Sequence, residues 1–200
     1  MNQFSTSIPL KEVPQGRLGI WMLIAGELVI FGGLIAAYLL YRFRFPEWAD
    51  QAAYTSTLLG GINTFVLLTS SYFVVMAHAA AINKQFEKIK LWMGLAIGCG
   101  LIFLVIKIIE YSTEMSHGFT MTSPSLVAAG DDIGSLFWSF YYFMTGLHGV
   151  HVLVGMIAMW AVMTSAAKGK NVHRVELVGM YWHMVDIIWI FLFPLLYIAK

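Results

Sequence analysis

The sequence predicts an all-α membrane protein, a polytopic bundle of five transmembrane helices. Of its 200 residues, 59% are hydrophobic and only 12% are charged, whereas roughly a quarter of residues are charged in soluble domains. The mean hydropathy is +0.74. Five stretches are long and apolar enough to cross a bilayer, which takes about 20 residues of helix. Water therefore cannot be the main solvent of this chain.

The five predicted spans are separated by polar connectors. The connectors FRFPEWADQA, NKQFEKIK and SHGFTMTSPSLVAAGDD contain the proline, glycine and charged residues typical of loops. Residues 1–16 form a polar tail without the apolar core of a signal peptide, and residues 17–200 form a single five-helix domain. The spans cover about residues 17–41, 54–82, 91–111, 133–167 and 175–199.

The distribution of basic residues predicts the orientation, because cytoplasmic loops are enriched in lysine and arginine. Eight basic residues fall on one side of the predicted spans and three on the other, which places the N-terminus in the cytoplasm and the C-terminus outside. The longest connector, which we expect outside, carries acids and no basic residue: Glu114, Asp131 and Asp132. The eight are Lys11, Arg17, Lys84, Lys88, Lys90, Lys168, Lys170 and Arg174, and the three are Arg42, Arg44 and Lys200.

Several classes of function are disfavoured by what the chain lacks. The formal net charge is +1, without the clustered lysine and arginine that bind a phosphate backbone, so no nucleic-acid partner is expected. Cys99 is the only cysteine and cannot form a disulfide within the chain. The motifs GxxxxGK[ST], GxGxxG, GxSxG and HExxH do not occur. The sequence therefore disfavours catalysis of the kind found in soluble enzymes.

Small residues predict where helices pack closely. Gly94 and Gly98 form a GxxxG pair, and Gly146 and Gly149 flank His148. A further small-residue face combines Gly32 and Gly33 with Ala36 and Ala37. We expect close helix contacts at all three places.

The candidate functional residues are the ionisable side chains inside the predicted spans. A charged group at the centre of a bilayer costs at least ~2.5–3.5 kcal/mol, so each should face protein or water and have a partner. Glu27 lies about ten residues into the first span, near the midplane at 1.5 Å per residue. The candidates are Glu27, Lys107, Glu110, His148, His151, His183 and Asp186.

Spacing groups six of these residues into three pairs. Residues three positions apart share a face of a helix, and this spacing joins Lys107 with Glu110, His148 with His151, and His183 with Asp186. We expect Glu110 to neutralise Lys107. We expect Asp186 to accept a hydrogen bond from His183 or from a neighbouring helix.

Residue type leaves three interpretations of these candidates open. They could form a proton relay, because glutamate, histidine and aspartate titrate at membrane depth. His148, His151 and His183 could together hold a metal or haem, although HxxH without a matched set of further ligands is a weak signal. Finally, the residues could be buried polar groups that satisfy one another and fix the helix register.

Five motifs resemble the subunit III family of haem-copper oxidases, typified by cytochrome c oxidase subunit III. YWHMVDIIWIF at residues 181–191 is similar to the last-helix pattern YWHFVDVVWLF of that family. The other motifs occur in the family order, and together they cover residues 17–199. They are the glutamate helix at 17–42 with Glu27, GGINTFVLLTSSYFVVMAHAA at 60–80, IKIIEY at 106–111 and TGLHGVHVLVG at 145–155.

The resemblance implies the short, five-helix bacterial form of subunit III. Such a subunit carries no redox cofactor or catalytic residue. It packs against the catalytic subunit I, which holds haem and copper, in a respiratory complex with subunit II in the bacterial cytoplasmic (inner) membrane. Expected roles are stabilising subunit I, holding phospholipid in a cleft and supporting proton uptake during aerobic electron transport. The family orientation agrees with the charge count.

Two departures from the family pattern keep alternatives open. Many members have seven helices, and the short form also occurs in quinol oxidases. Lys107 stands where many oxidase subunits carry glutamine or another neutral residue. In this respect the chain is similar to short family members associated with nitric oxide reductase. The alternatives are an accessory subunit of a quinol oxidase or of a nitric oxide reductase-type complex, and a stand-alone membrane haem or metal protein.

Overall fold

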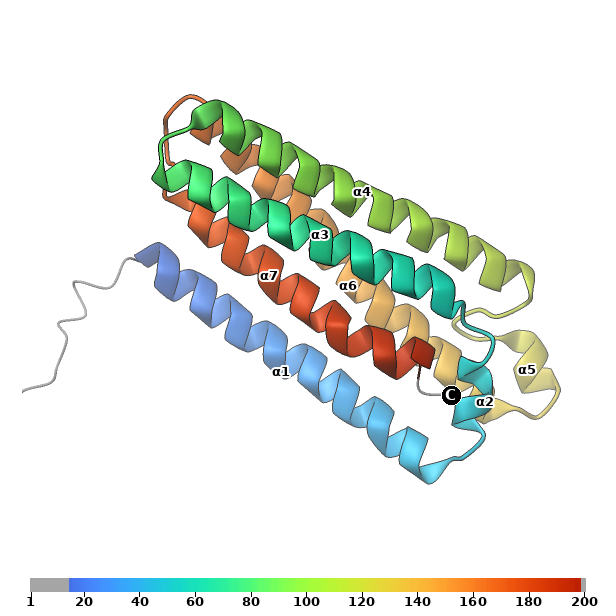
Figure 1. Ribbon diagram of the computed structural model, residues 1–200. Helices are drawn as coiled ribbons and strands as arrows, with labels where there is room; N and C mark the ends of the chain where they lie inside the picture. Colours follow the sequence, from blue (N-terminus) through green and yellow to red (C-terminus); the bar gives the residue numbers. More distant parts are fainter. Residues whose placement is uncertain (1–14, 199–200) are drawn as a thin grey trace, which may run out of the picture.

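The computed structural model describes residues 15–198, and this part of the chain is helical without a β-strand. Its five long helices run side by side (Figure 1) and all are long and apolar enough to cross a membrane. The all-α, five-span prediction is therefore confirmed. The helices are α1 (Gln15–Arg44), α3 (Thr57–Ile82), α4 (Phe86–Ser116), α6 (Asp132–Ala166) and α7 (Arg174–Phe193), which continues as the π-helix η2 (Pro194–Ile198).

Two connectors that were predicted to be loops each contain a short helix. These are α2 (Trp48–Ala52) and α5 (Pro124–Ala128), and both lie at the end of the bundle where α7 ends (Figure 1). Gln51 of α2 accepts a hydrogen bond from the Trp138 indole at 3.1 Å and donates one to Asp131 at 3.0 Å. The buried Trp48 ring stacks on Tyr41. These contacts explain why the connector folds back onto the bundle.

The helices form a four-helix bundle with a fifth helix outside it. In the bundle, α4 packs on α3 and α6, and α7 packs on the same two helices from the other side. Helix α1 lies along α7 and touches α6 less extensively (Figure 1). Within the 18-residue apolar stretch of α1, only 11% of the residues are buried, against 56% in the corresponding stretch of α7. Helix α7 is therefore the centre of the fold, and α1 leaves most of its surface free.

The tightest helix contacts occur at glycines other than the expected ones. A Cβ atom on Gly155 of α6 would lie 2.8 Å from the Trp182 ring, and one on Gly100 of α4 would lie 2.6 Å from the Met156 sulfur. In contrast, a Cβ on Gly94 or Gly98 meets nothing within 4 Å. The same is true of Gly32 and Gly33, and a Cβ on Gly146 or Gly149 would make only ordinary contacts.

The prediction of close packing at those small residues was therefore wrong within this chain. Buried residues of α4 such as Ala96, Gly100 and Phe103 define the core-facing side of the helix. Gly94 lies about 160° around the helix axis from Ala96 at 100° per residue. Gly94 and Gly98 have the GxxxG spacing, but they lie on the outward side of α4.

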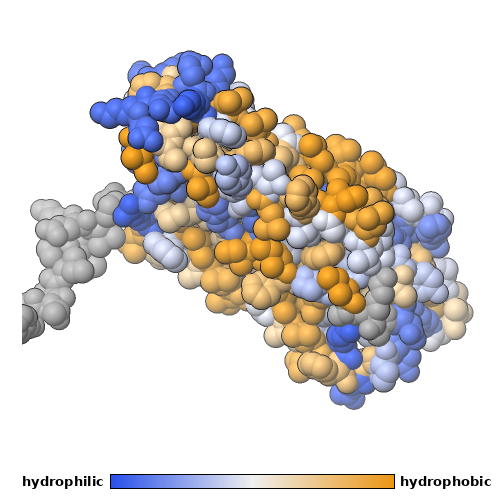
Figure 2. Space-filling view, viewed as in Figure 1, coloured by the Kyte–Doolittle hydropathy of each residue, from blue (hydrophilic) through white to orange (hydrophobic). Residues whose placement is uncertain are grey.

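Polar and apolar surfaces are arranged as a bilayer requires. In Figure 2 hydrophobic residues cover the middle of the visible face, and hydrophilic residues gather toward the two ends. The turns between α3 and α4 and between α6 and α7 share one end, and α2, α5 and η2 share the other (Figure 1). Basic residues collect at the first of these ends: Arg17, Lys84, Lys88, Lys90, Lys168, Lys170 and Arg174.

Candidate functional site

A buried lysine lies at the centre of a polar cluster inside the bundle. The ammonium of Lys107 is 3.0 Å from the Glu110 carboxylate, and only 6% and 1% of the two side chains are exposed. The structure thus joins the pair that the three-residue spacing predicts. A helical i,i+3 spacing brings the two side chains together without help from any other element.

Two tyrosines from other elements complete this lysine cluster. Lys107 Nζ also donates hydrogen bonds to the hydroxyls of Tyr197 at 2.8 Å and Tyr141 at 3.2 Å, and the Tyr141 hydroxyl donates to Glu110 at 2.9 Å. All three ammonium protons therefore have an acceptor. The rings of Tyr111, Tyr141, Tyr197 and Trp189 lie 4.7–5.8 Å from the ammonium, which is cation–π distance.

The sequence reasoning missed most of the lysine cluster. Tyr141 comes from α6 and Tyr197 from η2, 34 and 90 residues away along the chain, and nothing local links them to Lys107. It also placed Glu114 in an outer loop, whereas α4 continues to Ser116 and buries Glu114 to 4% exposure. The available signal was the spacing of Lys107, Glu110, Tyr111 and Glu114, which continues the helical pattern.

A second cluster connects α1 to the bundle. His151 Nε2 of α6 lies 3.2 Å from Glu27 of α1, and His151 Nδ1 lies 3.0 Å from the Tyr181 hydroxyl of α7. The Glu27 contact has ion-pair distance but not the geometry of a full hydrogen bond. The sequence left the partner of Glu27 open, and the structure identifies it as His151.

The hydrogen bonds of this cluster fit two arrangements of its protons. The Tyr181 hydroxyl lies 3.2 Å from the His151 carbonyl and 3.0 Å from His151 Nδ1, so it can donate to either atom, and the imidazole tautomer differs between the two cases. In both cases His151 Nε2 faces the Glu27 carboxylate at 3.2 Å. The cluster thus places an acid and an imidazole side by side at membrane depth.

His148 does not join His151. It is completely buried, and its ring packs edge-on against Phe103 at 5.6 Å and lies 5.1 Å from the Trp189 ring. Neither ring nitrogen has a hydrogen-bond partner among the described residues. The expected histidine pair is thus divided between two environments, the bundle core for His148 and the junction with α1 for His151.

His183 and Asp186 of the YWHMVD motif lie against α3 and do not bond to each other. His183 Nδ1 lies 2.6 Å from the Ser71 hydroxyl. Asp186 is 3% exposed, and neither of its oxygens makes a hydrogen bond within residues 15–198, although Ser71 lies close to it. A hydrogen bond from His183 to Asp186, one of the two expected arrangements, is therefore absent there.

Indole groups connect α7 to α3 along the same line. The Trp182 indole donates to Ser70 at 2.7 Å, and the Trp189 indole donates to Thr64 at 3.0 Å. Thr64, Ser70 and Ser71 thus present hydroxyls to two places on α7 that lie about two turns apart. This ladder fixes the register of the two helices, a role that the sequence motif alone did not reveal.

The three histidines proposed as a ligand set are not brought together. Among the described residues no group of three or more histidine, cysteine, aspartate or glutamate side chains converges as a metal site would require. His148, His151 and His183 face the core, α1 and α3 respectively. The geometry therefore does not provide the site on which the stand-alone metal or haem protein depended.

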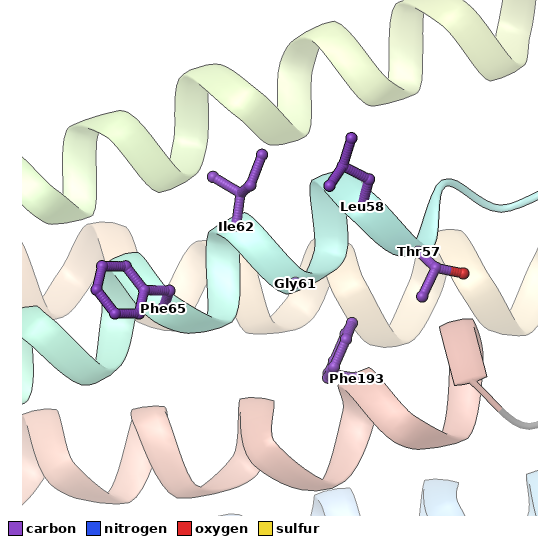
Figure 3. A pocket seen from close by; sticks show the side chains of 6 residues that line it. All are labelled: Thr57, Leu58, Gly61, Ile62, Phe65 and Phe193. Carbon is purple, nitrogen blue, oxygen red and sulfur yellow. The ribbon is translucent and has the colours of Figure 1, made fainter.

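Two grooves on α7 are apolar. The larger, about 680 Å³, is a shallow hollow beside α3 and Phe193 (Figure 3), and no titratable side chain lines it. The second, about 300 Å³, runs between α1, α6 and α7 from Arg174 to Tyr181. The first is lined by Thr57, Leu58, Gly61, Ile62, Phe65 and Phe193, and the second by Ile20, Leu23, Val154, Ala158, Val162, Arg174, Leu177, Val178 and Tyr181.

These features define a multi-pass membrane subunit in which most of the buried ionisable groups contact other residues of the same chain. The model of the cytochrome c oxidase subunit III family matches residues 10–200. The chain therefore belongs to this family, as the subunit III of a haem-copper oxidase.

Individual relatives agree with the family assignment. The chain is 33% identical to cytochrome c oxidase subunit 3 of Bacillus subtilis over 199 residues, covering 95% of this chain and 90% of the relative. It is 32% identical to the protein of the same name from Synechocystis sp., covering 90% and 74%. It is also 30% identical to a probable quinol oxidase subunit 3 of Staphylococcus saprophyticus, covering 90% and 87%.

Proposed function

We propose that this chain is the cofactor-free subunit III of a respiratory cytochrome c oxidase in a bacterial cytoplasmic membrane. The match to the subunit III family over residues 10–200 carries the proposal. Haem and copper then reside in partner subunits I and II, where oxygen is reduced, and this chain is not catalytic. Its part in aerobic electron transport is to stabilise the catalytic subunit and to support proton uptake.

The loosely packed α1 supports a role in assembly. Only 11% of its 18-residue apolar stretch is buried within the chain, and exposed side chains such as Val29 and Leu40 are apolar. A surface of this kind must face lipid or another subunit in the membrane. Helix α1 is held to the bundle by Glu27, by the exposed Arg17–Glu176 ion pair at 2.6 Å and by the Tyr38 hydroxyl, which donates to the Leu195 carbonyl at 3.1 Å.

The Glu27–His151 pair supports the proposed link to proton uptake. Its carboxylate and imidazole lie 3.2 Å apart, and each side chain is 16% exposed. A partly exposed acid beside an imidazole can exchange protons with a neighbouring water chain. We propose that this pair, and not the enclosed Lys107–Glu110 pair, is the part of the subunit that supports proton uptake.

The groove between α1, α6 and α7 supports lipid binding. It is lined mainly by aliphatic side chains, and its one cationic residue, Arg174, lies at the end of the bundle. This combination suits an acyl chain with a phosphate headgroup at the arginine. The groove ends at Tyr181, so the lipid would lie next to the Glu27–His151 pair.

The proposed orientation places the N-terminus in the cytoplasm and the C-terminus outside. The seven basic residues gathered at the end with the α3–α4 and α6–α7 turns support it, because lysine and arginine favour the cytoplasmic side. The lysine cluster, which contains Tyr197 near the end of the chain, then lies in the outer half of the bundle.

Co-purification tests the proposed function. A tagged form of the chain, extracted in mild detergent, should bring down the haem- and copper-containing subunits I and II. Deleting the chain should leave haem and copper in the remaining complex but lower its yield or its durability during turnover. A purified oxidase that never contains the chain would rule the proposal out.

The electron donor distinguishes the second candidate, a quinol oxidase. The staphylococcal relative named as a probable quinol oxidase subunit 3 favours it, at 30% identity. The co-purified complex should oxidise reduced cytochrome c under the first proposal and a quinol under the second. Reduction of nitric oxide in place of oxygen would support the nitric oxide reductase alternative suggested by Lys107.

A further inference from the structure

A separate groove lies between α4 and α6 at the basic end of the bundle. It has a volume of about 260 Å³ and is lined by Lys90 of α4 and by Met163, Thr164, Ala167 and Lys168 at the end of α6. The lipid groove proposed above uses a different side of α6, with Val154, Ala158 and Val162. The two grooves are therefore distinct sites.

The charged side chains that line this groove are both positive. Neither Lys90 nor Lys168 forms an ion pair with a carboxylate among residues 15–198. Of the acids at this end, Glu176 is paired with Arg17 and Glu87 does not line the groove. The Thr164 hydroxyl donates to the Ala161 carbonyl, so the two ammonium groups are the donors left for a ligand.

The surface below the lysines is apolar and partly open. Gly94 lies one turn along α4 from Lys90, and a Cβ there meets nothing within 4 Å. Trp160 lies one turn before Thr164 on α6 and is 60% exposed. An exposed tryptophan near a helix end is typical of the headgroup level of a bilayer. The groove thus carries two cations, and the apolar strip formed by Gly94 on α4 and Trp160 on α6 lies one turn from it, toward the membrane interior.

We propose that this α4–α6 groove binds the phosphate of an anionic phospholipid. The ammonium groups of Lys90 and Lys168 hold the headgroup phosphate, and an acyl chain lies on the strip beside Gly94 and Trp160. Basic pockets between transmembrane helices bind anionic headgroups in this way, and long lysine side chains can reach the interface to do so. A free phosphate ion would use the two lysines but not the apolar strip. The proposed orientation places the lipid in the cytoplasmic leaflet.

A pair of matched double variants tests this site. Lys90→Gln with Lys168→Gln removes both cations from the groove, whereas Lys88→Gln with Lys170→Gln removes the same charge from exposed positions at the same end that do not line it. Each full chain is purified with its partner subunits in mild detergent. It is then titrated with phosphatidylglycerol or phosphatidylcholine of identical acyl chains, and bound lipid is counted by native mass spectrometry.

We expect the unmodified protein to bind phosphatidylglycerol more tightly than phosphatidylcholine. The groove variant should lose roughly 30-fold in affinity for phosphatidylglycerol, since each lysine near a headgroup contributes about a fivefold factor. The Lys88 and Lys170 variant should bind nearly as the unmodified protein does. Equal losses in the two variants, or equal binding of the two lipids, would overturn the proposal.

Two further measurements separate the site from its competitors. Lys90→Arg with Lys168→Arg keeps the charge and should retain most of the affinity, so its failure to bind would contradict an electrostatic site. Inorganic phosphate, compared with chloride at equal ionic strength, should not displace the lipid, and displacement would assign the site to a free anion. If the groove variant loses a partner subunit while binding phosphatidylglycerol normally, the groove is a protein contact and the proposal fails.

Discussion

The ammonium of Lys107 and the carboxylate of Glu110 lie 3.0 Å apart inside the bundle, and the hydroxyls of Tyr141 and Tyr197 complete their hydrogen bonds. This cluster joins α4 to α6 and to the π-helix at the end of α7. Hydrocarbon cannot solvate either charge, so each group depends on the others. Lys107 therefore has a complete set of partners within its own chain and needs none from another subunit.

Replacing Lys107 alone should strongly destabilise the bundle. Lys107→Met leaves the Glu110 carboxylate buried without its cation, and removal of one partner of a buried pair costs about 3–5 kcal/mol. The free energy of unfolding, measured by detergent-induced denaturation of the purified protein, should fall by that amount.

The matched double variant separates the pair from its surroundings. Lys107→Met combined with Glu110→Met removes both charges and should restore a large part of the lost stability, because an apolar pair of similar size is often as stable as a buried ion pair. Additive losses in the double variant would show that the two residues do not act as a pair.

Glu27 should matter more for assembly than for turnover. Glu27→Ala removes the mid-helix contact between α1 and His151, so less of α1 is fixed against the bundle. We expect a several-fold lower yield of complex per cell and a nearly unchanged turnover per haem. Glu47→Ala, at an exposed carboxylate after α1, is the control and should change neither quantity. Normal assembly with lost proton pumping would instead make Glu27 part of a relay.

The sequence predicts best those features that depend on local geometry or on solvent. The five helices follow from the length of apolar chain that a bilayer requires. The contact of Lys107 with Glu110 follows from three-residue spacing on a helix. Both are properties of a single segment, so no knowledge of the packing was needed.

The partners of most candidate residues could not be predicted, because they depend on how each helix is rotated against its neighbours. His148 and His151 share one segment, but they are about 60° apart around the helix axis at 100° per residue, and this difference sends them to separate neighbours. His183 binds Ser71, which is 112 residues away. Rotation also explains why Gly94 faces outward although its spacing fits a packing motif.

Two glycine substitutions test this view of the packing. Gly155→Ala places a methyl group 2.8 Å from the Trp182 ring, so the buried indole must shift, and overpacking of this kind costs about 1–3 kcal/mol. Gly94→Ala meets open space and should leave the unfolding free energy unchanged or slightly raised, because alanine is the better helix former. Equal destabilisation by the two variants would show that the α4–α6–α7 contact is not the tight one.

Asp186 provides the test of whether the YWHMVD motif needs a charge. Its carboxylate is 3% exposed and forms neither a hydrogen bond nor an ion pair among the described residues, so an ionised form is costly in the membrane. Asp186→Asn keeps the shape and allows the amide to bond to Ser71. We expect it to assemble and turn over as the unmodified protein does.

Asp186→Ala should behave differently, because it leaves a small cavity between α7 and α3 next to Ser71. Its yield of assembled complex should fall below that of Asp186→Asn, with turnover per haem changed less than yield. Ser71→Ala, which removes the partner of His183, is the companion variant and should lower the yield in the same direction. If Asp186→Asn assembles normally but its complex loses proton pumping, the charge itself is required, and the motif carries protons in addition to holding α7 against α3.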